Sequence, residues 1–388
     1  MLIGAAALHA QEPSSAGDIP PQPAVGELPP PPVDDNASCE QRKGVEFIAD
    51  VEFDTAIIND EFGPSHDQLQ PSGTTAGARI SPRVGLGFGR GNRVMLGADI
   101  AKDFGSSVPV YAEFSLWYQN TIPLKKGGEF TFGAGIIPYS KSIGDYTTLI
   151  FSEQSCFTDF NFDGFMFQLS KDDNVFEFLF DWNGMMSKTR HEEFYFVSYG
   201  LLYLAPVVAL GYQGSFHHYA SSEEVRGVVD DHVLNPFVLL DFSSLTGMQA
   251  LSLNIGGIAG YQRDRVAGQR KYPLGADVRL EARHWNVGIV NEAYYGQSQA
   301  PFYKSLDPAG EPYEDRLYFR DAVWQITPDA HHGFYDRLEV FWAPHISDWI
   351  DISVKVVAHF AGGFTGTQQI GEVKVNLEDI FARKWRKR

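Results

Sequence analysis

The sequence has few cysteines, fewer basic than acidic residues and no long apolar run. Its two cysteines, Cys39 and Cys156, form neither the spacing of a metal site nor a disulfide framework. No run of about 18 apolar residues occurs, so we expect no membrane-spanning helix in the processed chain. The formal net charge of -18 argues against nucleic-acid binding, because neutralising phosphate groups requires a basic surface.

The composition favours a folded chain. Its 388 residues suffice for one large domain or two ordinary ones, and a hydrophobic content of 44% excludes wholesale disorder. Aromatic residues make up 14% of the chain, which also contains 38 glycines. Without a spanning helix, the alternatives are a soluble all-β protein and a transmembrane barrel.

The stretch from Gly275 to Trp285, GADVRLEARHW, alternates between small or aliphatic residues and charged ones. As a strand it would carry the aliphatic groups on one face and four charges on the other, because successive side chains point to opposite faces. A helix would instead spread the charges around its circumference and leave no apolar stripe. The same alternation recurs in VEFIADVEFD from Val45 and in VYAEFSLWYQ from Val110. We interpret these stretches as strands between hydrocarbon and water.

Strand length and loop length decide between the two all-β alternatives. The alternating stretches are about ten residues long, whereas globular strands have about five or six residues and bilayer-spanning strands about nine to eleven. Short connections such as GRGN and KKGG alternate with long polar ones such as residues 59–77 and 297–332. This predicts an all-β fold: a transmembrane antiparallel up-and-down β-barrel of about sixteen strands, with short periplasmic turns and long extracellular loops.

Aromatic residues lie beside the predicted short turns. They are Trp117, Tyr118, Tyr203, Trp285, Trp342 and Trp349. We expect them to form an aromatic girdle at the periplasmic interface of the membrane. The alternative is that aromatic residues are merely frequent in this chain.

The two ends of the chain differ from the predicted barrel. Residues 1–11, MLIGAAALHAQ, are typical of the apolar part and cleavage end of a secretory signal, so we assign a signal-peptide remnant; a buried N-terminal helix is the alternative. Residues 12–42 predict a Pro-rich periplasmic tail with too little apolar content to fold. We expect the transmembrane β-barrel at residues 43–382 and a basic C-terminal tail at residues 383–388.

With these features the chain resembles outer-membrane porin-like β-barrel proteins, and most of all the porins of the Bacteroidetes. The resemblance is carried by the signal-like start, the alternating strands from Val45 to Ile380 and the runs FEFLFDWNGM and LGADVRLEARHW. It implies a location in the bacterial outer membrane. One departure concerns the end: many such barrels finish on an aromatic residue read by the assembly machinery, whereas here NLEDIF is followed by ARKWRKR. Phe381 is the best candidate for that residue.

A closed barrel of about sixteen strands encloses an aqueous channel that side chains alone do not fill. We expect the charged face of each strand to point into this channel. The predicted pore-lining residues are Glu46, Asp50, Glu52, Asp54, Arg79, Arg83, Arg93, Asp99, Glu113, Glu177, Asp181, Asp277, Arg279, Glu281, Arg283, Arg337, Glu339 and Lys355. Arginines on the second and third strands beside acids on the first predict a transverse field that passes hydrated polar solutes and holds back apolar ones. A salt-bridge network that only braces the wall is the alternative. The excess of acids favours cations.

Two long loops are candidates for narrowing the channel. Residues 139–157 contain an apolar group, Leu149, Ile150 and Phe151, which predicts a constriction loop folded into the lumen; packing against neighbouring loops is the alternative. The loop at residues 297–332 is rich in Tyr, Asp and Pro. It could hold a sugar by stacking on Tyr303, Tyr313 and Tyr318, or simply cover the mouth.

The sequence predicts no metal site, no cofactor and no catalytic motif. Residues Asp159 to Gly164 fit the opening of a calcium loop, but Ser170 stands where the bidentate acid belongs. The histidine pairs at 217–218 and 331–332 lie near loop ends, where histidines are usually solvated. No G-x-S-x-G sequence occurs, and no spacing identifies a nucleophile.

The sequence therefore predicts an outer-membrane porin, not an enzyme, through which ions and small hydrophilic solutes diffuse passively. One alternative is an outer-membrane barrel enzyme, a protease or lipid hydrolase, with a site at His217, His218 or external acids; a narrow barrel with a packed lumen would favour it. The other is a soluble carbohydrate-binding β-sandwich. Outer-membrane lipid and lipopolysaccharide are the expected partners, and general porins suggest a homotrimer by analogy.

Overall fold

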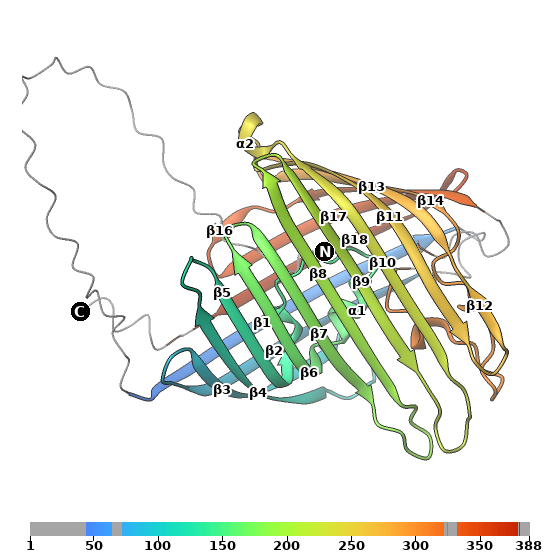
Figure 1. Ribbon diagram of the computed structural model, residues 1–388, viewed down its shortest axis with the longest axis horizontal. Coiled ribbons are helices and arrows are strands. Elements are labelled where there is room, and N and C mark those ends of the chain that lie inside the picture. Colours follow the sequence, from blue (N-terminus) through green and yellow to red (C-terminus); the bar gives the residue numbers. More distant parts are fainter. Residues whose placement is uncertain (1–43, 64–71, 322–323, 325–331, 379, 381–388) are drawn as a thin grey trace, which may run out of the picture.

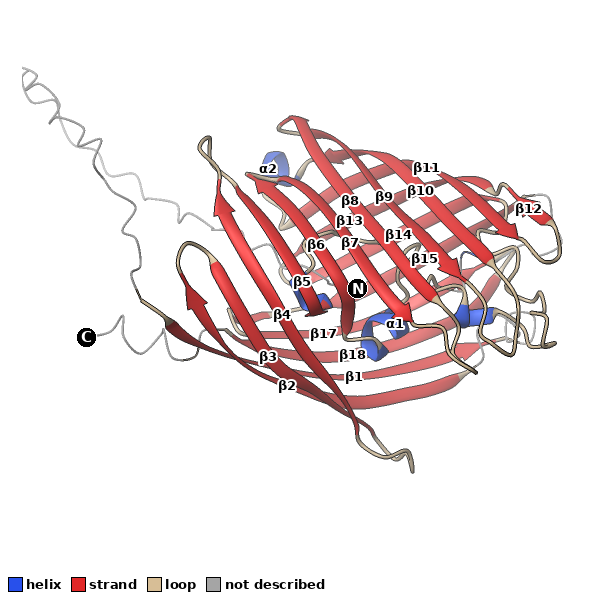
Figure 2. Cartoon of the chain, turned by 60° about the horizontal axis from the view of Figure 1, so that its bottom comes forward, coloured by secondary structure: helices blue, strands red, loops and turns tan. Residues whose placement is uncertain are grey.

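The computed structural model describes residues 44–63, 72–321, 324, 332–378 and 380. Several sequence-based predictions lie outside these residues: the signal-peptide remnant at 1–11, the Pro-rich tail at 12–42, the basic tail at 383–388, the role of Phe381 and one of the paired histidines, His331. Within the described part of the chain β-strands predominate (Figure 2).

The described residues form long strands joined by turns, loops and a few short helices. The strands are β1 (Glu46–Phe62), β2 (Gly73–Phe88), β3 (Asn92–Asp103), β4 (Tyr111–Pro123), β5 (Glu129–Pro138), β6 (Asn161–Lys171), β7 (Asn174–Gly184), β8 (Glu193–Ala205), β9 (Val208–Tyr219), β10 (Val229–Asp241), β11 (Ala250–Asp264), β12 (Gln269–Lys271), β13 (Leu274–His284), β14 (Val287–Gly296), β15 (Gly333–Trp342), β16 (His345–Ser347), β17 (Ile350–Phe360) and β18 (Phe364–Leu377). The helices are η1 (Tyr139–Lys141), α1 (Glu153–Thr158), α2 (Ser243–Thr246) and η2 (Glu314–Arg316). None of these described helices has the length and apolar character needed to cross a membrane.

The strands form one sheet that closes on itself. β1 pairs with β2 on one side and with β18 on the other, from Val51↔Leu377 to Phe62↔Gly366. Apart from the three-residue strands β12 and β16, sixteen strands, each antiparallel to its neighbours in sequence, complete the ring (Figure 1, Figure 2). The predicted sixteen-stranded up-and-down barrel is confirmed. A single closed sheet contradicts the β-sandwich alternative, which requires two packed sheets.

Residues of alternate parity face opposite sides of the barrel wall. On β1, Phe53 and Ile57 are exposed outside, whereas Glu52 and Asp54 are buried inside. Exposed apolar side chains recur around the wall, among them Ile80, Val84, Leu96, Phe114, Leu116, Leu234, Ile255, Val278, Val340 and Val356. An apolar exterior around a charged interior reverses the arrangement of a soluble protein and suits a wall in contact with hydrocarbon.

Most connections at one end of the barrel are tight turns, and most at the other end are longer loops, although only residues 361–363 join β17 to β18 at the long-loop end. Trp285 and Asn286 connect β13 to β14 with φ values of 51° and 67°, because both central residues of a type I′ hairpin turn need positive φ. The longest loops connect β5 to β6 and β14 to β15. Several strands exceed the predicted length, and β1 has 17 residues. Such strands are longer than a tilted crossing requires, so they continue past the apolar band.

The prediction that Trp117 belongs to the aromatic girdle is wrong. The Trp117 side chain is buried inside the barrel within the main hydrophobic cluster. Trp117 shares the inward parity of Glu113 and Ser115, whereas Tyr118 pairs with the exposed Val94 and points outward. Trp285, Trp342 and Trp349 are exposed, as a girdle requires.

Candidate functional site

The loop between β5 and β6, residues 139–160, folds into the barrel. Its apolar residues Leu149, Ile150 and Phe151 are all buried and belong to the main hydrophobic cluster. The Phe151 ring lies 5.9 Å from that of Tyr195 on β8, in an edge-on arrangement. Burying these groups against the wall removes apolar surface that would otherwise lie in water, which holds the loop in the lumen.

A buried carboxylate on β7 fixes the first part of this loop. Glu177 accepts hydrogen bonds from the Ser142 hydroxyl at 2.6 Å and from the backbone N–H groups of Ile143 at 2.7 Å and Gly144 at 3.2 Å. The Gln168 side chain donates to the same carboxylate at 2.6 Å. Several donors around one buried acid satisfy its charge without a cation.

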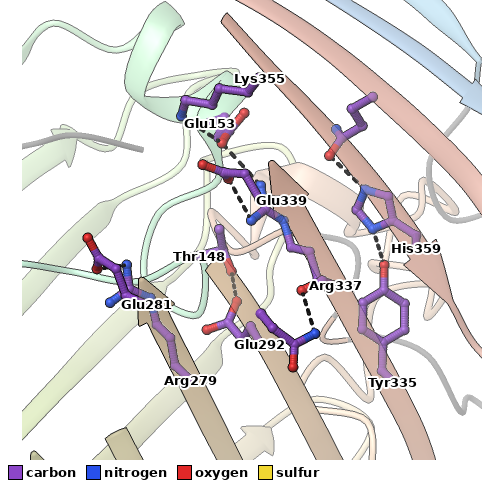
Figure 3. A network of polar contacts seen from close by, with 12 residues as sticks. Thr148, Glu153, Arg279, Glu281, Glu292, Tyr335, Arg337, Glu339, Lys355 and His359 are labelled. Atoms are coloured by element: carbon purple, nitrogen blue, oxygen red, sulfur yellow. Dashed lines mark hydrogen bonds and ion pairs between the residues drawn. The ribbon is translucent and has the colours of Figure 1, made fainter. Parts of the chain in front are cut away.

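The second part of the loop is anchored by charge on the opposite wall. Ser152 caps helix α1 by accepting from the Ser155 N–H at 3.0 Å. Glu153, the first residue of α1, lies 3.2 Å from Arg337 of β15 and 3.4 Å from Lys355 of β17 (Figure 3). Burial alone would raise the pKa of Glu153, but Lys355 and Arg337 hold that pKa well below its usual range. The carboxylate is therefore ionised at neutral pH and ties α1 to the wall.

The loop between β14 and β15 also turns inward and meets the first loop. Phe319 accepts at its carbonyl from the Ser152 N–H at 2.7 Å and from the Ser155 hydroxyl at 3.0 Å. Trp324 donates its indole N–H to the Thr148 hydroxyl at 3.2 Å. Thr148 in turn donates to Glu292 of β14 at 3.1 Å (Figure 3). The two loops and the wall thus form one connected network.

The tyrosines of the second loop form its own core. Tyr303, Tyr313 and Tyr318 are all buried, in a cluster that also contains Phe302 and Leu317. Rings that pack against one another in a core do not offer two open faces for stacking on a sugar. Tyr303 and Tyr318 nevertheless border the open part of the lumen.

A cavity remains beside the described parts of the two loops. A cavity of about 1240 Å³ lies between them and the wall formed by β1, β2, β17 and β18. Its lining reaches Pro344 and His345 at the short-turn end and Ser72 and Thr74 at the long-loop end. The cavity therefore extends from one end of the barrel to the other.

Acids outnumber bases along this cavity. Ten carboxylates line it, namely Glu52, Asp54, Asp60, Glu153, Asp159, Asp315, Asp321, Asp351, Glu372 and Glu378, against five lysines and arginines, namely Arg79, Lys141, Arg283, Arg320 and Lys374. Where ionised carboxylates outnumber cationic side chains in a confined passage, the local concentration of cations rises.

The structure distributes the predicted pore-lining residues over several environments. Glu52, Asp54, Arg79 and Arg283 line the open cavity. Asp50, Arg83, Asp99, Glu177, Asp181, Asp277, Arg337, Glu339 and Lys355 are buried in the barrel. Glu113, Arg279 and Glu281 are partly buried, and Glu46 and Arg93 are exposed.

The predicted charge opposition between strands takes a different form. Arg83 of β2 lies 2.7 Å from Glu52 of β1 and 2.9 Å from Asp99 of β3. Arg79 and Asp54, 3.4 Å apart, are direct cross-strand partners. Adjacent strands place these opposite charges side by side on one wall, an arrangement that links the strands to one another.

Several charged residues of the channel come from loops and were not predicted. They are Lys141, Glu153, Asp315, Arg320 and Asp321. Alternation assigns a direction only to side chains on strands, so it contains no signal for these loop positions.

Neither of the two remaining candidate motifs forms an open site. Asn161 and Asp163 of the calcium-like stretch lie on β6, where Asn161 donates to Asp99 at 3.0 Å. His217 is fully buried between the Leu317 carbonyl at 2.8 Å and Glu193 at 2.9 Å. Within the described ranges, no cluster of His, Cys, Asp and Glu is placed to hold a metal ion.

A closed antiparallel barrel with an apolar exterior, a charged interior and inward-folded loops defines the class of transmembrane β-barrels. No family model matches the chain, and no curated protein is similar to it.

Solved structures with a similar architecture include OccAB3 of Acinetobacter baumannii, an anion-selective porin of Comamonas acidovorans and a loop L8 deletion mutant of OmpT, an outer membrane protein of Vibrio cholerae. Each is 8% identical to this chain and covers 86% of it and 99% of its own length, with TM-scores of 0.44, 0.43 and 0.48 respectively. Likeness at this level carries no functional information, so the function must follow from the residues of this chain.

Proposed function

We propose that this protein is an outer-membrane porin through which ions and small hydrophilic solutes diffuse passively, with a preference for cations. The observation that carries the proposal is the charged cavity that extends from the short-turn end of the barrel to the long-loop end. Its lining contains ten carboxylates and five lysines and arginines, so hydrated cations are favoured within it.

The outer face supports the membrane location. Exposed aliphatic and aromatic side chains such as Ile80, Leu116 and Val340 recur on strands around the whole wall. A soluble protein rarely exposes apolar patches larger than a few hundred Å², whereas a transmembrane barrel needs such a band. The short turns then face the periplasm and the long loops face outward. The finer resemblance, to porins of the Bacteroidetes, is part of this proposal and is supported by the runs FEFLFDWNGM and LGADVRLEARHW.

A barrel enzyme is less well supported by the same residues. His217 is one of the residues at which such an enzyme would have its site. It is enclosed by Glu193 and the inward loop, so it cannot reach a substrate at the mouth. His218 is bonded to Asp230 at 2.7 Å. The proposal therefore assigns transport without a cofactor and no catalytic step.

The test is single-channel recording of the purified full chain in a planar bilayer under a salt gradient. We expect steady conductance steps and a reversal potential of the sign that indicates cation preference. Folded, heat-modifiable protein that gives no conductance would contradict the porin function. Anion preference would contradict the role assigned to the cavity lining.

A further inference from the structure

A row of polar side chains crosses the outer face of the barrel near the long loops. His218 of β9 pairs with Asp230 of β10, which pairs with Arg263 of β11, which pairs with Arg270 of β12. Directly paired residues of antiparallel strands point to the same side of the sheet. The neighbouring Asp231 is buried inside the barrel and contacts the inward loop, so this row faces outward.

A row of aromatic side chains lies beside it, two residues further toward the middle of the wall. Phe216 and His232 have ring centroids 3.9 Å apart, His232 and Tyr261 are stacked at 5.5 Å, and Tyr261 and Tyr272 are 5.5 Å apart. Two residues correspond to roughly 7 Å along a strand. Aromatic rows on the outside of a membrane barrel mark the depth where hydrocarbon meets headgroups. The polar row therefore lies at headgroup depth.

The charges of the polar row are not balanced. Asp230 accepts two hydrogen bonds from Arg265, at 2.9 and 3.0 Å, and one from His218 at 2.7 Å. Arg263 and Arg270, in contrast, face each other directly across two strands, and neither forms an ion pair or side-chain hydrogen bond within the described chain. Like charges at directly paired positions repel, and an anion bound between them would remove that repulsion.

We propose that Arg263 and Arg270 bind the phosphate group of a phosphorylated glycolipid in the outer leaflet, with Tyr261 and Tyr272 against its upper acyl chains. Guanidinium groups match the geometry of phosphate oxygens and bind them through paired hydrogen bonds. A lipid is the source because the pair faces the outside of the wall beside the aromatic row and lies outside the lining of the cavity. The assignment rests on the proposed outer-membrane location and orientation.

The experiment is a lipid titration of the full chain in detergent, read by native mass spectrometry. The probe is diphosphoryl lipid A, and lipid A stripped of both phosphates is the reference. The variants are the double substitution Arg263→Gln with Arg270→Gln and, as matched control, Lys271→Gln. Lys271 is the next residue of β12 and pairs with the inward-facing Gln262, so it lies on the other side of the wall. Heat-modifiable migration establishes that each variant is folded.

We expect the wild type and Lys271→Gln to bind the diphosphoryl lipid equally, and the double variant to bind it about thirtyfold more weakly. All three proteins should bind the dephosphorylated lipid with the same weak affinity. Unchanged binding by the double variant, or an equal loss with Lys271→Gln, would overturn the assignment. Inorganic phosphate that displaces the lipid at equal phosphate concentration would show a site for free anions and overturn the lipid source.

Conductance of the same preparations separates this inference from the proposed function. Because the arginine pair lies outside the cavity lining, the double variant should conduct like the wild type. Conducting protein that shows no phosphate-dependent lipid binding would overturn the lipid site alone. Protein that binds the lipid as expected but never conducts would overturn the porin function alone.

Discussion

Substitution of Glu153 tests whether the charged anchor of α1 shapes the channel. Glu153→Gln removes one carboxylate from the cavity and leaves Lys355 and Arg337 without its charge. Removing one partner of a buried ion pair costs about 3–5 kcal/mol, and we expect the lower figure because Arg337 keeps Glu339 at 3.0 Å. A loss of about 3 kcal/mol weakens the attachment of α1 on the order of a hundredfold.

The rest of the loop should stay in place after this substitution. Leu149, Ile150 and Phe151 each contribute roughly 1.5–3 kcal/mol by burial, and Glu177 still holds the backbone near Ser142. The change is therefore local: α1 leaves the wall for part of the time while the apolar segment remains docked. In single-channel recordings this predicts larger conductance, more open-channel noise and weaker cation preference.

Glu372→Gln is the matched control for Glu153→Gln. Glu372 lies on β18, lines the same cavity and pairs with Lys374 at 2.7 Å, so its substitution removes the same charge from the wall without touching the loop. We expect weaker cation preference in both variants, but higher noise and conductance only with Glu153→Gln. Identical noise and conductance in the two variants would refute the anchoring role of Glu153.

Three further perturbations follow from the contacts described above. Arg83→Met leaves Glu52 and Asp99 buried without their shared cation, so unfolding in urea should require about 3–5 kcal/mol less free energy; an unchanged midpoint would contradict the bracing role. Leu149→Ala should weaken the docking of the loop between β5 and β6 by about 2–5 kcal/mol and make this loop more sensitive to protease. Unchanged cleavage would contradict this prediction. Burial would raise the pKa of Asp307, but hydrogen bonds from backbone N–H groups and from Arg316 outweigh burial and lower that pKa. The ionised carboxylate therefore stabilises the loop between β14 and β15 at neutral pH, and this stabilisation is lost as the pH falls through the lowered pKa. Asp307→Asn should therefore increase cleavage of this loop at pH 7 but not in strong acid with pepsin, and a difference that persists in acid would contradict this.

The fold could be predicted because the membrane imposes a period on the sequence. GADVRLEARHW alternates strictly because the wall separates two solvents, and its strand, β13, has Val278 exposed and Asp277 buried, as the alternation requires. Trp117 shows the limit of reading residue type alone. Its type suggested the interface, but its parity, shared with Glu113 and Ser115, turns it inward.

The candidate site was predictable only where it lies on strands. Alternation along a strand shows that Glu52 and Arg79 point into the lumen. It does not show whether a loop covers an inward-facing residue, as the loop between β5 and β6 covers Glu177. The apolar segment from Leu149 to Phe151 suggested an inward loop because exposed apolar groups are unfavourable in water. The position of Glu153 depends on contacts with β15 and β17, about two hundred residues further along the chain, and no local pattern encodes them.

The seam between β1 and β18 has a consequence for how the chain is assembled. Asn59 and Gln369, whose side chains bond across it, are 310 residues apart in sequence. Every other pair of neighbouring long strands is joined by a single connection, so those hairpins can form as the chain emerges, whereas this seam must wait for the final strand. Until then, the outer edges of β1 and of the last strand added expose unpaired backbone groups to any other strand nearby. A chain that stops short of β18 should therefore aggregate rather than form a smaller barrel.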